Sequence, residues 1–106
     1  MIMKNINNGY GIHEYVYNKR GQSVGVFAAV PSDYDTSVVH IGWSRANKRA
    51  GDRFDKKMGT VIAFERSRKA SAAEVPASMI DHYNFFYNRC KRYFKERNVV
   101  SKVGTI

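Results

Sequence analysis

The spacing of apolar residues changes along the chain. In the first half every second residue is apolar, as in a β-strand, and in the second half the apolar residues follow the period of an α-helix. This change is the feature that most constrains the fold. Strand-forming residues alternate in three short segments, which are YGIHEYVYN (10–18), QSVGVFAAV (22–30) and SVVHIGWS (37–44). Turn-forming residues separate these segments, among them Asn18-Lys19-Arg20-Gly21. Short turns favour neighbouring antiparallel strands, so the first half predicts a meander.

The second half has the helical period. A first helix is predicted to begin after Asp52, which would cap it, and to end between Arg66 and Lys69. Gly59 inside this helix suits a close approach to the sheet. The apolar residues that share one face, and that we expect to be buried, are Phe54, Met58, Val61 and Ile62.

A second helix is predicted from about Pro76 to Arg97. Ser78 and Asp81 have the spacing of a capping box at its start. The residues expected to form its buried stripe are Met79, Tyr83, Phe86, Tyr87, Cys90, Tyr93 and Phe94.

Together these elements predict an α+β domain with a three-stranded antiparallel sheet and two helices packed on one of its faces, in the order βββαα. The 106 residues fit a single domain, with residues 1–8 and 101–106 as loosely ordered tails. Hydrophobic residues make up 43% of the chain, which is too many for an intrinsically disordered one. No apolar run approaches the roughly 18 residues that span a bilayer, and the N-terminus lacks the apolar core of a secretory signal. The single cysteine, Cys90, excludes an internal disulfide, so we expect a cytoplasmic protein.

The charge of the chain is unevenly distributed. The net charge is +9, whereas residues 1–44 contain as many acidic as basic residues. The segment GWSRANKRAGDRFDKKMG (42–59) holds six basic residues and two acids. A positive field concentrated in this way attracts polyanions, which makes nucleic acid or an acidic protein surface the expected partner.

This basic segment is the candidate binding site. Lysine and arginine neutralise phosphates, and an indole ring offers a surface on which a base can stack. Trp43 also has a second interpretation as a core residue, because it shares a strand side with Val39 and Ile41. The residues predicted to bind nucleic acid are Trp43, Arg45, Lys48, Arg49, Arg53, Lys56 and Lys57, with Arg89 and Arg92 extending the surface.

The run HIGWS…GDRFDKKMGTVIAFERS, within residues 37–68, resembles a segment of small, mostly uncharacterised bacteriophage-encoded proteins. In these proteins a Gly-Trp-Ser strand end leads through a basic loop to a Phe-Asp-Lys helix start and an Ile-Ala run. The resemblance implies a phage protein that acts in the bacterial cytoplasm. It implies no activity.

Three alternatives to simple nucleic-acid binding stay open. A phage inhibitor could place its basic surface, with an exposed Phe85 and tyrosines such as Tyr15 and Tyr17, on an acidic face of a host enzyme. A small ribonuclease or hydrolase could use His13 or His40 as its acid or base. Self-association is also left open. No catalytic motif, metal-ligand spacing or cofactor motif is present, so we expect a non-enzymatic protein without a metal or cofactor.

Overall fold

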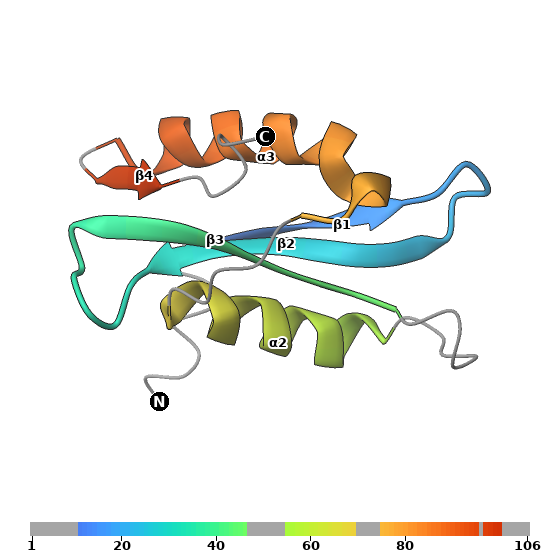
Figure 1. The fold of residues 1–106 in the computed structure, drawn as a ribbon, viewed down its shortest axis with the longest axis horizontal. Helices are drawn as coiled ribbons and strands as arrows, with labels where there is room; N and C mark the ends of the chain where they lie inside the picture. Colours follow the sequence, from blue (N-terminus) through green and yellow to red (C-terminus); the bar gives the residue numbers. More distant parts are fainter. Residues whose placement is uncertain (1–10, 47–54, 70–74, 96, 101–106) are drawn as a thin grey trace.

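The computed structural model describes residues 11–46, 55–69, 75–95 and 97–100. A four-stranded sheet lies between two helices, α2 (Lys56–Arg68) and α3 (Ile80–Tyr93), so that the described residues form three layers (Figure 1). The fold is therefore α+β, as the sequence predicts. The predicted tails 1–8 and 101–106 lie outside the described residues.

Three strands form the predicted antiparallel meander. β1 (Ile12–Tyr17) pairs with β2 (Ser23–Pro31), and β2 pairs with β3 (Val38–Arg45). The turn between β1 and β2 contains Gly21 with a φ of 78°, which is the left-handed conformation that glycine adopts at little cost. This part of the predicted fold is confirmed.

A fourth strand, β4 (Asn98–Val100), was not predicted. The second helix ends at Tyr93 rather than near Arg97, and β4 then pairs in parallel with the start of β3. The Asn98 amide donates to the Ser37 carbonyl over 2.9 Å, and the Arg97 Nε donates to the Thr36 carbonyl over 2.7 Å. Three residues are too few for a visible alternation, and their partner lies far away in the sequence.

The prediction that both helices cover one face of the sheet is wrong. Val26, Ala28 and Val30 of β2 pack on the α2 side, whereas Phe27 and Ala29 pack on the α3 side. The physical reason is the composition of β2, which is apolar on both faces and is buried without interruption from residue 25 to residue 30. A strand of this kind needs a covering layer on each face.

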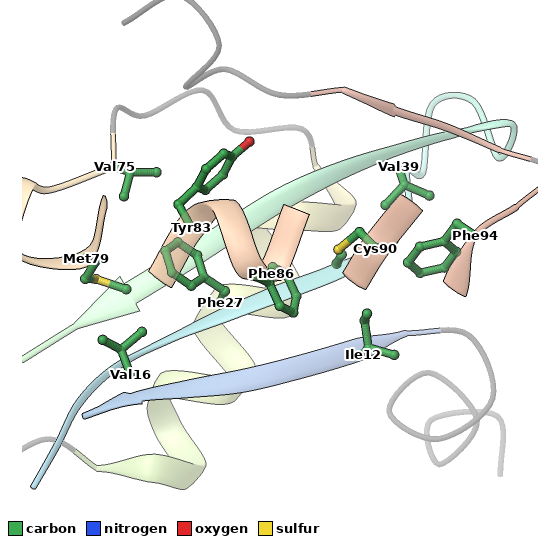
Figure 2. Close-up of a cluster of buried hydrophobic side chains, with 11 residues drawn as sticks. Ile12, Val16, Phe27, Val39, Val75, Met79, Tyr83, Phe86, Cys90 and Phe94 are labelled. Atoms are coloured by element: carbon green, nitrogen blue, oxygen red, sulfur yellow. The ribbon is translucent and has the colours of Figure 1, made fainter. Parts of the chain in front are cut away.

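The core on the α3 side follows the sequence pattern closely. Phe27 stacks on Phe86 with ring centroids 5.7 Å apart and meets Tyr83 edge-on at 5.8 Å. Of the predicted stripe, Tyr87 is half-buried and Tyr93 is 48% exposed. The prediction that Tyr93 is buried is therefore wrong. The buried members are Met79, Tyr83, Phe86, Cys90 and Phe94 (Figure 2).

The start of α3 also differs from the prediction. A short 3₁₀ segment, η3 (Ala77–Met79), precedes the helix, and Met79 is its N-cap without a side-chain hydrogen bond. The predicted capping box of Ser78 and Asp81 is therefore not formed. Instead the Ser78 hydroxyl accepts a long hydrogen bond of 3.4 Å from Arg45 Nη1.

On the other face of the sheet, α2 buries a different side from the predicted one. Met58 and Val61 are 57% and 55% exposed, Ile62 is half-buried, and Phe54 lies outside the described residues. The helix approaches β3 at Gly42, where an added Cβ would lie 2.6 Å from the Ser67 amide nitrogen. Only small side chains fit between main chains this close, which is why Gly59, Ala63 and Ser67 face the sheet here. Phe64, on the same side of the helix, packs against Val26, Ala28 and Val30 of β2. The close approach expected of Gly59 is confirmed, since the Ser44 hydroxyl donates to its carbonyl over 2.8 Å.

Candidate functional site

Basic residues from three elements gather at one end of the sheet. β3 ends there, α2 begins there, and the turn between β1 and β2 lies at the same end (Figure 1). The Ala46 amide donates to the Val24 carbonyl over 3.1 Å, so the end of β3 lies beside the strand that follows the turn. We call this region the basic end and define it by five exposed residues, Lys19, Arg20, Arg45, Lys56 and Lys57.

The turn from residue 18 to residue 22 presents two of these cations. The Asn18 side-chain oxygen accepts hydrogen bonds from the amides of Arg20 and Gln22 at 2.9 and 3.0 Å. Asparagine suits this position because its short side chain can close a turn in place of the backbone. The Lys19 and Arg20 side chains are left in solvent.

The start of α2 presents Lys56 and Lys57. Asp55 is the N-cap, in an extended conformation, and its carboxylate accepts a hydrogen bond of 3.1 Å from the Met58 amide. The predicted cap Asp52 lies outside the described residues, and Asp55 fills that role. An anion at the helix start would meet this carboxylate, so a phosphate is better placed against the lysine side chains.

Two tyrosine rings of β1 lie beside Lys56. Its ammonium is 4.9 Å from the ring centroid of Tyr15 and 5.7 Å from that of Tyr17. The Tyr15 hydroxyl donates to Thr60 Oγ1 over 3.1 Å, since the Thr60 hydroxyl itself donates to the Lys56 carbonyl over 2.7 Å. Tyr15 is thus fixed against α2, whereas Tyr17 is 46% exposed.

Trp43 is half-buried and packs against the core on the α3 side. Arg66 of α2 reaches around the edge of β3, where its Nη1 donates to the Trp43 carbonyl over 2.8 Å. The Arg66 guanidinium also lies 5.7 Å from the indole centroid. These contacts support the core interpretation of Trp43 over the stacking one.

Apart from Trp43, the predicted site residues divide into three groups. Arg45, Lys56 and Lys57 belong to the basic end. Arg89 and Arg92 lie on α3, about 14 and 18 Å along the axis from its first residue, and are not brought to the basic end. Those that lie outside the described residues are Lys48, Arg49 and Arg53.

Arg89 has a partner within the chain. Its Nη1 donates to the Glu14 carboxylate over 2.9 Å and to the His13 carbonyl over 3.3 Å, which attaches α3 to the outer strand of the sheet. Arg92 is exposed. The contacts of Arg89 therefore give it a structural role, which is to hold α3 against β1.

The basic end keeps a net positive charge, because five cations stand there against the Asp55 carboxylate at the start of α2. In the part of the chain that the structure describes, the ion pairs join Lys69 to Glu65 at 3.4 Å and Arg89 to Glu14 at 2.9 Å. Neither pair includes a residue of the basic end. Its five cations therefore keep a positive field that an external anion can share.

The histidines that suggested acid–base chemistry do not meet each other. His13 lies opposite Ala28 and His40 opposite Val30, so the two lie two strand spacings apart across the sheet, about 10 Å, and are also offset by two residues along β2. His13 packs edge-on against Tyr15 and Phe64 at 5.3 and 5.8 Å. Burial, with a smaller effect of Arg89, lowers the pKa of His13 below 6.5. Within residues 11–46, 55–69, 75–95 and 97–100, no three His, Cys, Asp or Glu residues are grouped as metal ligands would be.

The sequence indicates that Tyr17 can be exposed, but it does not place Lys19 and Arg20 at the basic end. Residues 18–21 predict a turn, and two adjacent cations in a surface turn do not by themselves indicate a binding site. What makes them part of a site is the register of β2 against β3, which pairs Gly25 with Arg45. Such long-range pairing has no local signature.

Comparison with known proteins adds no assignment. No family model matches the sequence, and neither a curated protein nor a solved structure matches it. Among the described residues, no helix has the length and apolar character needed to cross a membrane.

Proposed function

We propose that this protein binds nucleic acid non-enzymatically and engages phosphates with the basic end. The observation that carries the proposal is the convergence of five exposed cations from the β1–β2 turn, the end of β3 and the start of α2. Lysine and arginine neutralise phosphates and release condensed counterions, so a cluster of this kind binds a polyanion with a strong salt dependence. The chain between residues 46 and 55, which carries three more predicted phosphate contacts, begins and ends here.

The test removes three charges whose side chains make no hydrogen bond or ion pair with the residues that the structure describes. Lys19, Arg20 and Lys57 are exposed, so replacing all three with Gln leaves the fold intact. The matched control replaces Lys91, Arg92 and Lys95, three exposed cations toward the other end of α3, and changes the net charge equally. Fluorescence anisotropy with labelled oligonucleotides, between about 50 and 200 mM salt, gives the affinity and its salt dependence.

We expect the basic-end variant to lose about tenfold or more in affinity and to flatten the slope of log K against log salt by about 2. The control variant should change both quantities much less. Equal losses in the two variants would show only a general effect of net charge. An unchanged affinity in the basic-end variant would exclude this region as the site.

A second candidate function is inhibition of a host protein by docking on an acidic surface. The observation that favours it is Phe85, which is 73% exposed on the outer face of α3 with exposed Arg92 two turns further on. Exposed aromatic and arginine side chains on one surface are typical of interface anchors. Phe85→Ser would abolish such docking and leave binding at the basic end unchanged. Either function fits the phage origin and cytoplasmic setting that the resemblance of residues 37–68 implies, and both of these remain proposals.

A further inference from the structure

We infer that the nucleic acid at the basic end is single-stranded and that one of its bases stacks on Tyr17. This inference rests on the proposed function and names the form of nucleic acid that the same site takes. It follows from the position of an aromatic ring among the cations, because charge alone does not distinguish a single strand from a duplex.

Tyr17 lies between two groups of cations. It is the last residue of β1, so the turn that carries Lys19 and Arg20 follows it directly. On the other side the Lys56 ammonium lies 5.7 Å from its ring centroid, and exposed Lys57 is the next residue. A strand that places phosphates against both groups would pass over this ring.

The two tyrosines differ in what they offer to a ligand. Tyr15 is held by contacts within the fold. It forms a hydrogen bond with Thr60, packs edge-on against His13 and lies under the Lys56 ammonium. Tyr17 remains 46% exposed, and in the described residues its ring contact is with Lys56. Its ring is therefore the one available to a base, on the face opposite the Lys56 ammonium, which lies over the ring.

A duplex cannot use this surface in the same way. The faces of paired bases are covered by their neighbours in the stack, so an aromatic side chain reaches them only in unpaired strands. Stacking accepts any base, since each has a π-face, and it adds to phosphate contacts without sequence selection. Trp43 does not supply this surface, because its indole is half-buried and packs against the core on the α3 side of the sheet.

The experiment compares Tyr17→Leu with Tyr17→Phe, which keeps the ring. The probes are labelled oligo(dT) and oligo(U) of about 15 nucleotides and a duplex of equal length, a size that covers one small domain. Tyr34→Leu is the matched control, because Tyr34 is 77% exposed in the turn between β2 and β3 at the other end of the sheet. Circular dichroism confirms that each variant is folded.

We expect the unmodified protein to bind the single strands more tightly than the duplex, and Tyr17→Leu to lose about fivefold or more in single-strand affinity. Tyr17→Phe should recover most of that loss, and Tyr34→Leu should show none. Tighter binding of oligo(U) than of oligo(dT) by the unmodified protein would identify RNA as the source of the strand, and the reverse would identify DNA.

Two outcomes overturn the inference in distinguishable ways. If Tyr17→Leu binds single strands like the unmodified protein, or if the duplex binds as tightly as the strands, the single-strand assignment fails while phosphate binding stands. If the variant of Lys19, Arg20 and Lys57 also binds every probe normally, the proposed function fails with it.

Discussion

The hydroxyl of Ser67, on α2, donates a hydrogen bond of 2.5 Å to the main-chain carbonyl of His40, on β3. The same oxygen accepts from the Val30 amide over 3.0 Å. Val30 and His40 are partners in the register of β2 and β3, so a helix side chain takes part in the hydrogen bonding of the sheet itself. This contact joins α2 to the two central strands at a fully buried point.

Replacing Ser67 with Ala should lower the free energy of unfolding by about 1–3 kcal/mol, because the Val30 amide is left buried without its acceptor. Urea unfolding measures the change. Ser78→Ala, at an exposed position, should stay within about 0.5 kcal/mol. Equal effects in the two variants would contradict a structural role for the Ser67 hydroxyl.

Gly42→Ala should cost about 1–3 kcal/mol or more, because the added methyl group would lie against the main chain of Ala63 and Ser67 rather than against a flexible side chain. Thermal unfolding followed by circular dichroism tests this. Gly21→Asn is the control, since the space around Gly21 is open and asparagine tolerates its positive φ. A Gly42→Ala variant as stable as this control would mean that α2 moves away at no cost.

Because α2 buries a different face from the one expected, substitutions of Val61 and Phe64 should have opposite effects on stability. Val61→Lys should change stability by less than about 0.5 kcal/mol, since Val61 is 55% exposed. Phe64→Ala should cost about 3–5 kcal/mol, since Phe64 is 2% exposed. Chemical unfolding of the two variants decides between the two faces, and the reverse order would restore the face expected from the sequence.

Stability should fall as the pH is lowered through 6.5, the ordinary pKa of histidine, because the pKa of His13 is lower in the folded protein. In that window the unfolded chain binds a proton that the folded chain does not, so acid favours unfolding. Asp35 stays ionised throughout, since hydrogen bonds from Ser37 lower its pKa below 3.8. Urea unfolding at about pH 7.5 and 5.5 should show a smaller drop for His13→Gln. An equal drop would remove His13 as the cause.

Cys90 should react slowly with thiol reagents in the folded protein. Burial raises the pKa of its thiol from 9.0 to about 12, which lowers the thiolate fraction about a thousandfold. Labelling with a chromogenic disulfide at about pH 8 should therefore be slow until denaturant is added. The control is Asn84→Cys in a Cys90→Ala background, which places a thiol at an exposed position of the same helix. Equally fast labelling at both positions would show that α3 opens readily.

The strands and the α3 stripe could be predicted because their apolar residues face one core at a regular period, as Met79, Tyr83, Phe86 and Cys90 do. The buried face of α2 could not be predicted, because it is determined by the close approach of the helix to Gly42 on β3. Apolar periodicity favours Met58 and Val61, whereas contact between main chains requires Gly59, Ala63 and Ser67.

The candidate site could be predicted only where it is continuous in the sequence. Arg45, Lys56 and Lys57 belong to one basic segment and were found. Strand pairing brings Tyr17, Lys19 and Arg20 to the same end of the sheet. Arg89 instead forms an ion pair with Glu14. These outcomes depend on long-range pairing and on which face of the sheet each helix covers.

The near-contact of main chains at Gly42 has a consequence for recognition. Long side chains between a helix and a sheet can change rotamer and let the two layers slide, but here little side-chain volume lies between them. α2 and β3 should therefore move together as one rigid unit. The spacing between Lys56 and Lys57 on the helix and Arg45 on the strand is then fixed before any ligand arrives. A partner that matches this spacing need not meet the entropic cost of ordering the scaffold on which those cations stand.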